Sequence, residues 1–244
     1  ATSPMHWFEF YNAANSHAWL VSDPPDGHVP AQTAEADARG AARAALRAQH
    51  GPADSWEDRS LWDRCITRGM PASMFPYRYN NGVQILQSPG YVVLNMEMIH
   101  EARVIPVGPM GSRPTLSPKI AQWLGESRGH FENNTLVIET TNFKPGASAT
   151  NIGVMGSPPG NRFPTSDRMK TTERLTRLGP DMLVYEITTE DPVVLTRPWT
   201  ARFPLKLDNG YVWWEYACHE GNRTIRDYIT TSRAERAAQA QQAR

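Results

Sequence analysis

Residues 91–106 read YVVLNMEMIHEARVIP and form the longest stretch of the chain that predicts a β-strand. Side chains on a strand point alternately to its two faces. One face of this strand carries Asn95 and Arg103 and mixes polar with apolar residues. The other face carries His100 among apolar neighbours. Both faces are therefore expected to contact protein rather than solvent. The residues of this predicted strand that could bind or react are Asn95, Glu97, Met98, His100, Glu101 and Arg103.

Six more segments also predict strands, because β-branched and aromatic residues alternate there with turn residues. Asn209 and Gly210 lie between two of these segments and predict a tight hairpin. Many strands joined by short turns favour an antiparallel arrangement, so we expect a mainly β fold, an antiparallel barrel of about eight to ten strands. The six segments are 82–87, 135–143, 168–178, 182–189, 199–207 and 211–219.

Helical signals are few. Residues 33–50 are rich in Ala and Arg and lack Pro, with Thr33 as a predicted N-cap and Gly51 and Pro52 after the last turn. A short helix is also predicted over 117–124. We expect an N-terminal arm and helix packed on the barrel at 1–54, the β-barrel domain at 55–233, and a polar C-terminal tail at 234–244.

Composition restricts the class of protein. The 244 residues fit one large β domain. Lys and Arg number 25, as do Asp and Glu, and such a neutral chain is not typical of proteins that bind nucleic acid. No stretch of 18 apolar residues predicts a membrane span. The expected partner is a small, partly apolar molecule.

The two cysteines, Cys65 and Cys218, are 153 positions apart, which excludes a C-x-x-C redox or zinc motif. Paired in space, they would close a very long loop and stabilise the fold. The alternative is two buried free thiols. Residues 1–4, Ala-Thr-Ser-Pro, resemble a mature start after cleavage at small residues, which favours a periplasmic or secreted protein.

His100 and Glu97 are candidates for acid–base catalysis. Burial raises the pKa of a carboxylate and lowers that of a histidine, and enzymes tune acid–base groups in this way. The structural alternatives are a core histidine with satisfied hydrogen bonds and a Glu–Arg pair without catalytic function.

A second candidate stretch, residues 213–222, reads WWEYACHEGN. Its strand is expected to end near Gly221, so that His219 and Glu220 lie where a strand opens into a loop. They could act as a base and its partner. Alternatively, Cys218 tethers the last strand through a disulfide.

A metal site is a further alternative. His100 and His219, with Glu97 or Glu220, would form a His/carboxylate set suited to Zn or Fe. No H-x-x-x-H or H-E-x-x-H spacing supports such a site. We therefore expect no cofactor.

Several stretches resemble a family of uncharacterised exported bacterial proteins. The likeness covers most of residues 55–222 and implies export and a disulfide, without indicating an activity. More loosely, the strand series resembles the lipocalin-like (calycin) barrels. The stretches are 55–66 (SWEDRSLWDRCI), 97–103 (EMIHEAR), 123–129 (WLGESRG), 139–143 (ETTNF), 197–200 (RPWT) and 216–222 (YACHEGN).

These observations predict an enzyme that acts on a small molecule by cofactor-free acid–base chemistry, as a lyase, isomerase or hydrolase. The alternative is a non-catalytic carrier of an apolar ligand in the same barrel. A homodimer is compatible with either function. The predicted catalytic residues are His100, Glu97, His219 and Glu220, and the predicted substrate-binding residues are Arg103, Tyr216, Trp199, Asn95 and Met98.

Overall fold

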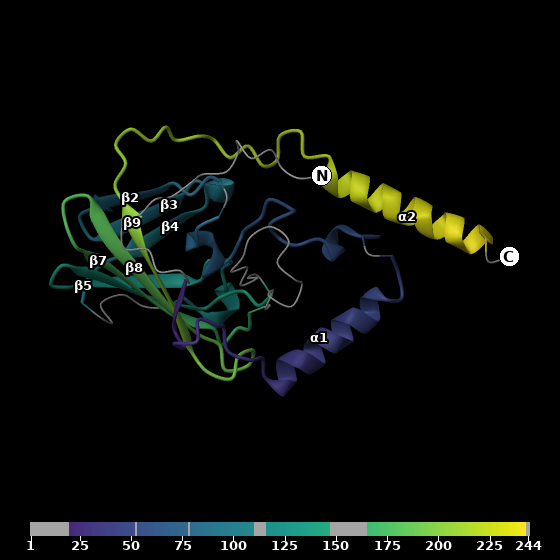
Figure 1. Cartoon of the computed structure of the whole chain (residues 1–244), viewed down its shortest axis with the longest axis horizontal. Helices are drawn as coiled ribbons and strands as arrows, with labels where there is room; N and C mark the ends of the chain where they lie inside the picture. The colour runs from purple at the N-terminus through teal and green to yellow at the C-terminus, as the bar shows by residue number, and fades with distance from the viewer. Residues whose placement is uncertain (1–19, 52, 78, 110–115, 147–164, 243–244) are drawn as a thin grey trace.

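The computed structural model describes residues 20–51, 53–77, 79–109, 116–146 and 165–242. Nine strands in these residues form two antiparallel sheets (Figure 1). The smaller sheet has the order β2 (Val83–Ser88), β3 (Tyr91–Met96), β4 (Ala102–Pro106). The larger sheet has the order β1 (Val21–Asp23), β9 (Trp199–Lys206), β8 (Met182–Glu190), β7 (Lys170–Arg177), β6 (Thr135–Thr141), β5 (Glu126–Glu132).

The two sheets enclose one hydrophobic core. Leu94 and Ile105 of the smaller sheet lie in the same buried cluster as Ile138, Tyr185 and Trp199 of the larger one. Just beyond β4, the amide of Gly108 donates to the carbonyl of Gly129 at 3.0 Å and joins the sheets at one edge. The sheets formed by the described residues are not closed into a barrel. The prediction of a mainly antiparallel β fold is confirmed, and the barrel is not.

Residues 91–106 form two strands, so the prediction of one continuous strand is wrong. β3 and β4 pair as a hairpin in which Asn95 lies opposite Ala102. The turn between them contains the 3₁₀ helix η4 (Met98–His100), where Ile99 and His100 have positive φ angles of 58° and 45°. This left-handed backbone reverses the chain and leaves the side chain of His100 exposed. The expected placement of His100 among apolar neighbours is therefore also wrong.

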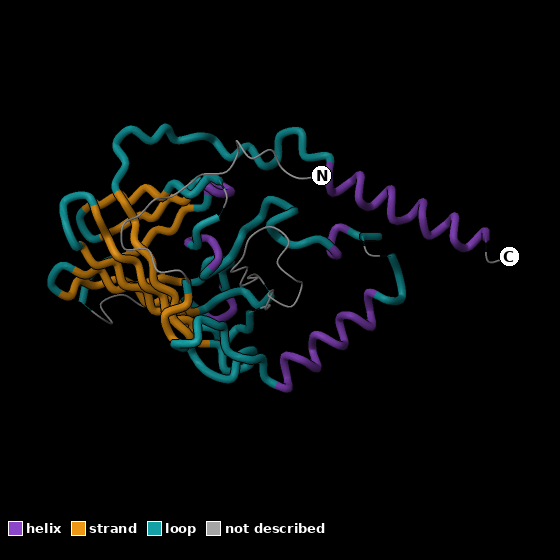
Figure 2. Tube along the Cα trace, in the orientation of Figure 1, coloured by secondary structure: helices purple, strands orange, loops and turns teal. Residues whose placement is uncertain are grey.

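The chain after β9 does not return as a strand. Residues 207–223, here called the C-terminal arm, are loop throughout in Figure 2. Asn209 and Gly210 form the predicted turn, but the predicted strand at 211–219 is wrong. The arm contacts the smaller sheet through Glu97 and is covalently held by the disulfide between Cys218 and Cys65. The alternative of two free thiols is thus excluded.

The described helices differ in how well the sequence predicts them. Helix α1 (Ala34–Arg47) begins as predicted, because Thr33 Oγ1 accepts a hydrogen bond from the amide of Ala36 at 3.1 Å. The predicted helix at 117–124 is only a 3₁₀ turn, η5 (Pro118–Ile120), and no described helix is long and apolar enough to cross a membrane. The predicted N-terminal arm lies outside the described residues as far as residue 19. The remaining helices are η2 (Trp56–Asp58), η3 (Ala72–Met74) and α2 (Thr224–Gln242).

An ion pair lies in the middle of the core. Arg103 on β4 donates to both carboxylate oxygens of Glu173 on β7, at 2.8 and 2.5 Å, and both side chains are almost fully buried. Burial is the largest single effect and lowers the pKa of Arg103, but the Glu173 carboxylate, with smaller effects of Tyr185 and Glu101, raises it, and the net pKa is raised. Tyr185 donates to the same carboxylate at 2.6 Å. The pair therefore joins the smaller sheet to two central strands of the larger one.

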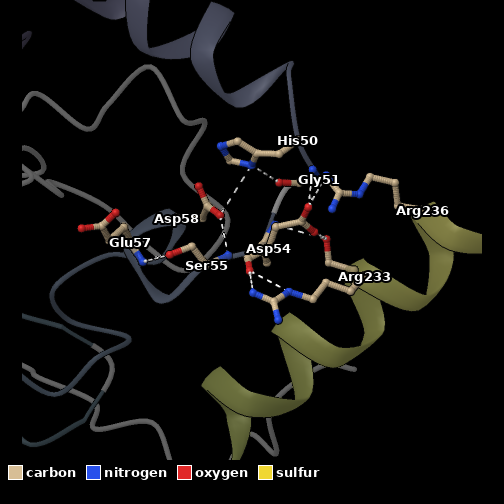
Figure 3. Close-up of polar contacts among 10 residues, drawn as sticks. His50, Gly51, Asp54, Ser55, Glu57, Asp58, Arg233 and Arg236 are labelled. Atoms are coloured by element: carbon tan, nitrogen blue, oxygen red, sulfur yellow. Dashed lines mark hydrogen bonds and ion pairs between the residues drawn. The ribbon is translucent and has the colours of Figure 1, made fainter.

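Helix α2 projects from the body of the molecule, and its polar contacts with the segment after α1 centre on Ala53 and Asp54 (Figures 1 and 3). Ser232 is its one buried residue among those described, and its hydroxyl donates to Asp54 Oδ1 at 2.8 Å. Arg236 lies 2.5 Å from Asp54 Oδ2, and Arg233 donates to the Asp54 carbonyl at 2.7 and 3.0 Å. The hydrogen bond from Gly51 does most to lower the pKa of Asp54. Asp54 is thus the centre of the docking site.

Glu173→Gln is expected to destabilise the protein by about 3–5 kcal/mol, because it leaves the charge of Arg103 buried without its counter-ion. Urea unfolding measures this change. Glu139→Gln, on the neighbouring strand, serves as the control, because Glu139 is partly exposed and its pair with Lys170 spans 3.4 Å. The control is expected to cost at most about 1 kcal/mol. Similar losses in both variants would contradict a special role for the buried pair.

Asp54→Asn is expected to loosen α2 without unfolding the sheets, because the helix has few apolar contacts to replace this carboxylate. Acid should have the same effect. The lowered pKa of Asp54 means that its contribution is present above its ordinary pKa and is lost as the pH falls below it. Hydrogen exchange of α2 at neutral and acid pH measures both effects. Glu57→Gln is the control, because Glu57 points away from α2 in Figure 3 and should leave exchange unchanged.

Candidate functional site

A cluster of aromatic and charged side chains lies beside the disulfide, where the 61–79 segment, the β3–β4 turn and the C-terminal arm meet. We call it the Arg68 cluster. Tyr77, Met98 and Ile99 form its buried apolar part, and Tyr79 and Tyr216 pack against them partly exposed. The full set is Trp62, Arg68, Tyr77, Tyr79, Met98, Ile99, Glu101 and Tyr216.

Arg68 brings a positive charge into this apolar setting. The residue is only 5% exposed, and its guanidinium carbon lies 5.2 Å from the ring centre of Trp62 and 5.0 Å from that of Tyr77. Its Nη1 donates to the Phe75 carbonyl at 3.4 Å, whereas its Nη2 has no hydrogen-bond partner among the described residues. Burial lowers the pKa of Arg68 to about 10, so it stays charged at neutral pH. A buried cation with a free N–H group favours an anionic ligand.

Glu101 supplies the carboxylate of the cluster; it too is buried, and it raises the pKa of Arg68 against the effect of burial. The hydroxyl of Ser73 donates to its Oε2 at 2.5 Å, the hydroxyl of Thr67 donates to its Oε1, and the amide of Arg68 approaches Oε2 at 3.4 Å. Burial raises the pKa of Glu101 above its ordinary value, and these hydrogen bonds and Arg68 oppose the rise only in part. Such a carboxyl group can exchange a proton closer to neutral pH than an exposed glutamate does.

Tyrosine hydroxyls complete the polar part of the cluster. Burial raises the pKa of Tyr79, which is hydrogen-bonded to Tyr216, so Tyr79 keeps its proton and can donate. His100 lies at the edge, with Nδ1 3.2 Å from the carbonyl oxygen of Tyr216. The cluster therefore contains one cation, Arg68, one carboxyl group that can exchange a proton, Glu101, and tyrosine hydroxyls. Its aromatic rings could contact the apolar part of a ligand.

The structure places three predicted site residues here, namely Met98 and Tyr216 in the cluster and His100 at its exposed edge. The other predicted residues lie elsewhere. Arg103 and Trp199 are in the core, Asn95 bonds Gln84 on the smaller sheet, and His219 and Glu220 are exposed near the end of the arm. The roles proposed for them from the sequence stay predictions.

Glu97 is buried and holds the C-terminal arm. Its carboxylate accepts four hydrogen bonds, from Asn80 Nδ2, the Gly82 amide, the Tyr211 hydroxyl and the Trp214 amide. A Cβ atom on Gly82 would lie only 2.8 Å from the carboxylate and 3.0 Å from the Tyr211 ring, so glycine lets the arm approach closely. This geometry fits Glu97 as an anchor of the arm rather than as a partner of His100.

Arg68 and Tyr79 were not among the predicted site residues, and Glu101 was named as a candidate without a catalytic or binding role. Residues 65–75 read CITRGMPASMF, in which Arg68 is the one charged side chain, and this isolation in an apolar stretch was the available signal. Among the described residues, no three His, Cys, Asp or Glu side chains are grouped closely enough to hold a metal ion.

Glu97→Gln is expected to free the arm, because the amide can accept fewer hydrogen bonds and carries no charge for the four donors. We expect faster hydrogen exchange at residues 211–218 and a stability loss of about 1–3 kcal/mol. His100→Ala is the comparison, because among the described residues His100 forms one hydrogen bond with the arm, to the Tyr216 carbonyl, and its loss should change exchange little. Equal effects of the two variants would contradict the role of Glu97 as the anchor.

Comparison of the chain with models of protein families, with curated proteins and with solved structures finds no match. The resemblance to exported bacterial proteins therefore stays a prediction, and the function has to be argued from the geometry of the Arg68 cluster.

Proposed function

We propose that the protein is an enzyme that acts on a small, partly apolar carboxylate by cofactor-free acid–base chemistry at the Arg68 cluster. One observation carries the proposal: a guanidinium group that is almost completely buried among aromatic rings retains an unbonded Nη2. Buried donors are normally satisfied, so an unbonded charged donor indicates a place for a ligand atom.

The chemistry around Arg68 favours a carboxylate ligand with an apolar body. Arginine binds carboxylates through strong, charge-assisted hydrogen bonds. Trp62, Tyr77 and Tyr79 supply flat apolar surfaces beside the charge. Aromatic surfaces around a few placed polar groups are typical of small-molecule sites.

Glu101 is the proposed general base or acid. It follows His100 in the chain and its raised pKa suits proton transfer from a carbon next to a carbonyl group. Arg68 would stabilise the negative charge that develops when the proton leaves. His100, at the edge of the cluster, is the proposed second proton-transfer group.

A non-catalytic carrier of the same ligand is the second candidate. Both oxygens of Glu101 already accept hydrogen bonds, from Thr67 and Ser73, as expected of a carboxylate with a structural role. In a carrier, Arg68 alone would recognise the ligand. Binding and turnover therefore have to be measured separately.

The disulfide supports a periplasmic or secreted location, because such bonds persist in oxidising compartments. We further propose that the chain closes into a lipocalin-like barrel and that the protein forms a homodimer.

Calorimetry with benzoate, phenylacetate and phenylpyruvate tests binding. Exchange of the phenylpyruvate methylene protons in D₂O, above the rate in buffer, tests proton abstraction. Arg68→Met is expected to weaken phenylacetate binding by about 10–100-fold, because it removes a charged hydrogen bond. Glu101→Gln should keep binding within a few-fold and slow exchange by roughly 10²–10⁴-fold. The wild-type rate should rise with pH through a pKa above the ordinary glutamate value, and Glu101→Gln should lack this rise.

Glu126→Gln is the matched control, because Glu126 is a buried carboxylate held by Arg128 and the Leu116 amide away from the cluster. It should leave binding and exchange unchanged. If a compound binds in an Arg68-dependent way but the protein does not speed exchange of the phenylpyruvate protons, the protein is a carrier, and the proposed enzyme function is contradicted. Failure of all three compounds to bind, with wild type and Arg68→Met behaving alike, would contradict both.

A further inference from the structure

A row of buried polar side chains crosses the inner face of the larger sheet. The register places one residue of each of five neighbouring strands directly opposite the next, from β5 to β9. All five are at most 7% exposed. The row is Ser127, Thr140, Thr171, Thr189 and Trp199.

The two halves of this row differ. Ser127 and Thr140 bond each other at 2.9 Å, and Arg103 Nη2 approaches their hydroxyl oxygens at 3.0 and 3.1 Å. In contrast, Thr171 Oγ1, Thr189 Oγ1 and Trp199 Nε1 have no hydrogen-bond partner among the described residues. One half is thus occupied by an arginine, and the other presents three unbonded polar atoms on adjacent strands.

Three such atoms side by side are unusual, because a buried polar group without a partner is costly and nearly all of them are satisfied. Adjacent strands lie about 4.8 Å apart, so the three groups follow one another at short intervals across the sheet. Trp Nε1–H only donates, and a threonine hydroxyl can donate as well, so the matching ligand group is an acceptor.

Charge in this part of the core is already balanced. Arg103 is paired with Glu173, and the three unbonded groups are neutral. The surroundings are apolar, with the ring of Phe75 centred 5.9 Å from that of Trp199 and with Ile187 and Met169 fully buried. A free anion would face a large desolvation cost here, whereas a neutral acceptor would not.

We propose that Thr171, Thr189 and Trp199 bind a small neutral molecule with a carbonyl group inside the core. This site uses none of the residues of the Arg68 cluster and does not depend on the function proposed there. It takes an uncharged ligand, whereas the Arg68 cluster takes an anion.

The experiment compares Thr171→Val and Thr189→Val with wild type, because valine keeps the shape of threonine and removes only the hydroxyl. If a ligand bonds these hydroxyls, each variant should lower the Tm by about 2–6 °C. Mass spectrometry of the purified wild-type protein, native and after denaturation, should also show a small neutral molecule, and both variants should lose most of it. Thr140→Val is the control: it breaks bonds to Arg103 and Ser127, so its Tm should fall while the molecule is retained.

An unchanged or higher Tm in both valine variants would show that the hydroxyls have no partner and would overturn the proposal. A lower Tm without any released molecule would indicate buried water and would overturn it as well. If the variants do not fold, the mass measurement on wild type decides: absence of a bound small molecule contradicts the site.

Discussion

The ion pair between Arg103 and Glu173 is the constraint on which the arrangement of the two sheets depends. A buried charge without its partner is strongly destabilising, so only packings that bring β4 over β7 are stable. The same guanidinium bonds Ser127 on β5 and Thr140 on β6, while Glu173 accepts from Tyr185 on β8. One pair thus fixes the smaller sheet against four strands of the larger sheet.

The β3–β4 hairpin links the buried ion pair to the candidate site, because it contains both Arg103 and Glu101. The turn and the start of β4 together direct three charged residues to three different parts of the molecule. Glu97 holds the C-terminal arm, Glu101 enters the Arg68 cluster, and Arg103 enters the core. Because the three residues lie within seven positions, any shift of the hairpin would disturb the arm, the cluster and the core together. The site is therefore built on the most constrained part of the fold.

Composition and pattern were enough to predict the antiparallel strands, the start of α1 at Thr33 and the possible pairing of Cys65 with Cys218. They could not predict the turn inside 91–106, since it needs a β-branched residue, Ile99, with a positive φ angle. The arm was missed because its aromatic residues resemble a strand, whereas Glu97 and Cys65 hold it outside both sheets. The site was predicted only in part, because the burial of Arg68 depends on contacts between distant segments.

The most direct test of the central claim is a crystal structure of the protein with phenylacetate. We expect the carboxylate on Arg68 Nη2, with the phenyl ring against Trp62 or the tyrosines of the cluster and the disulfide intact. A structure in which Nη2 is satisfied by a protein group, with the aromatic rings closed around it and phenylacetate absent or bound elsewhere, would contradict it.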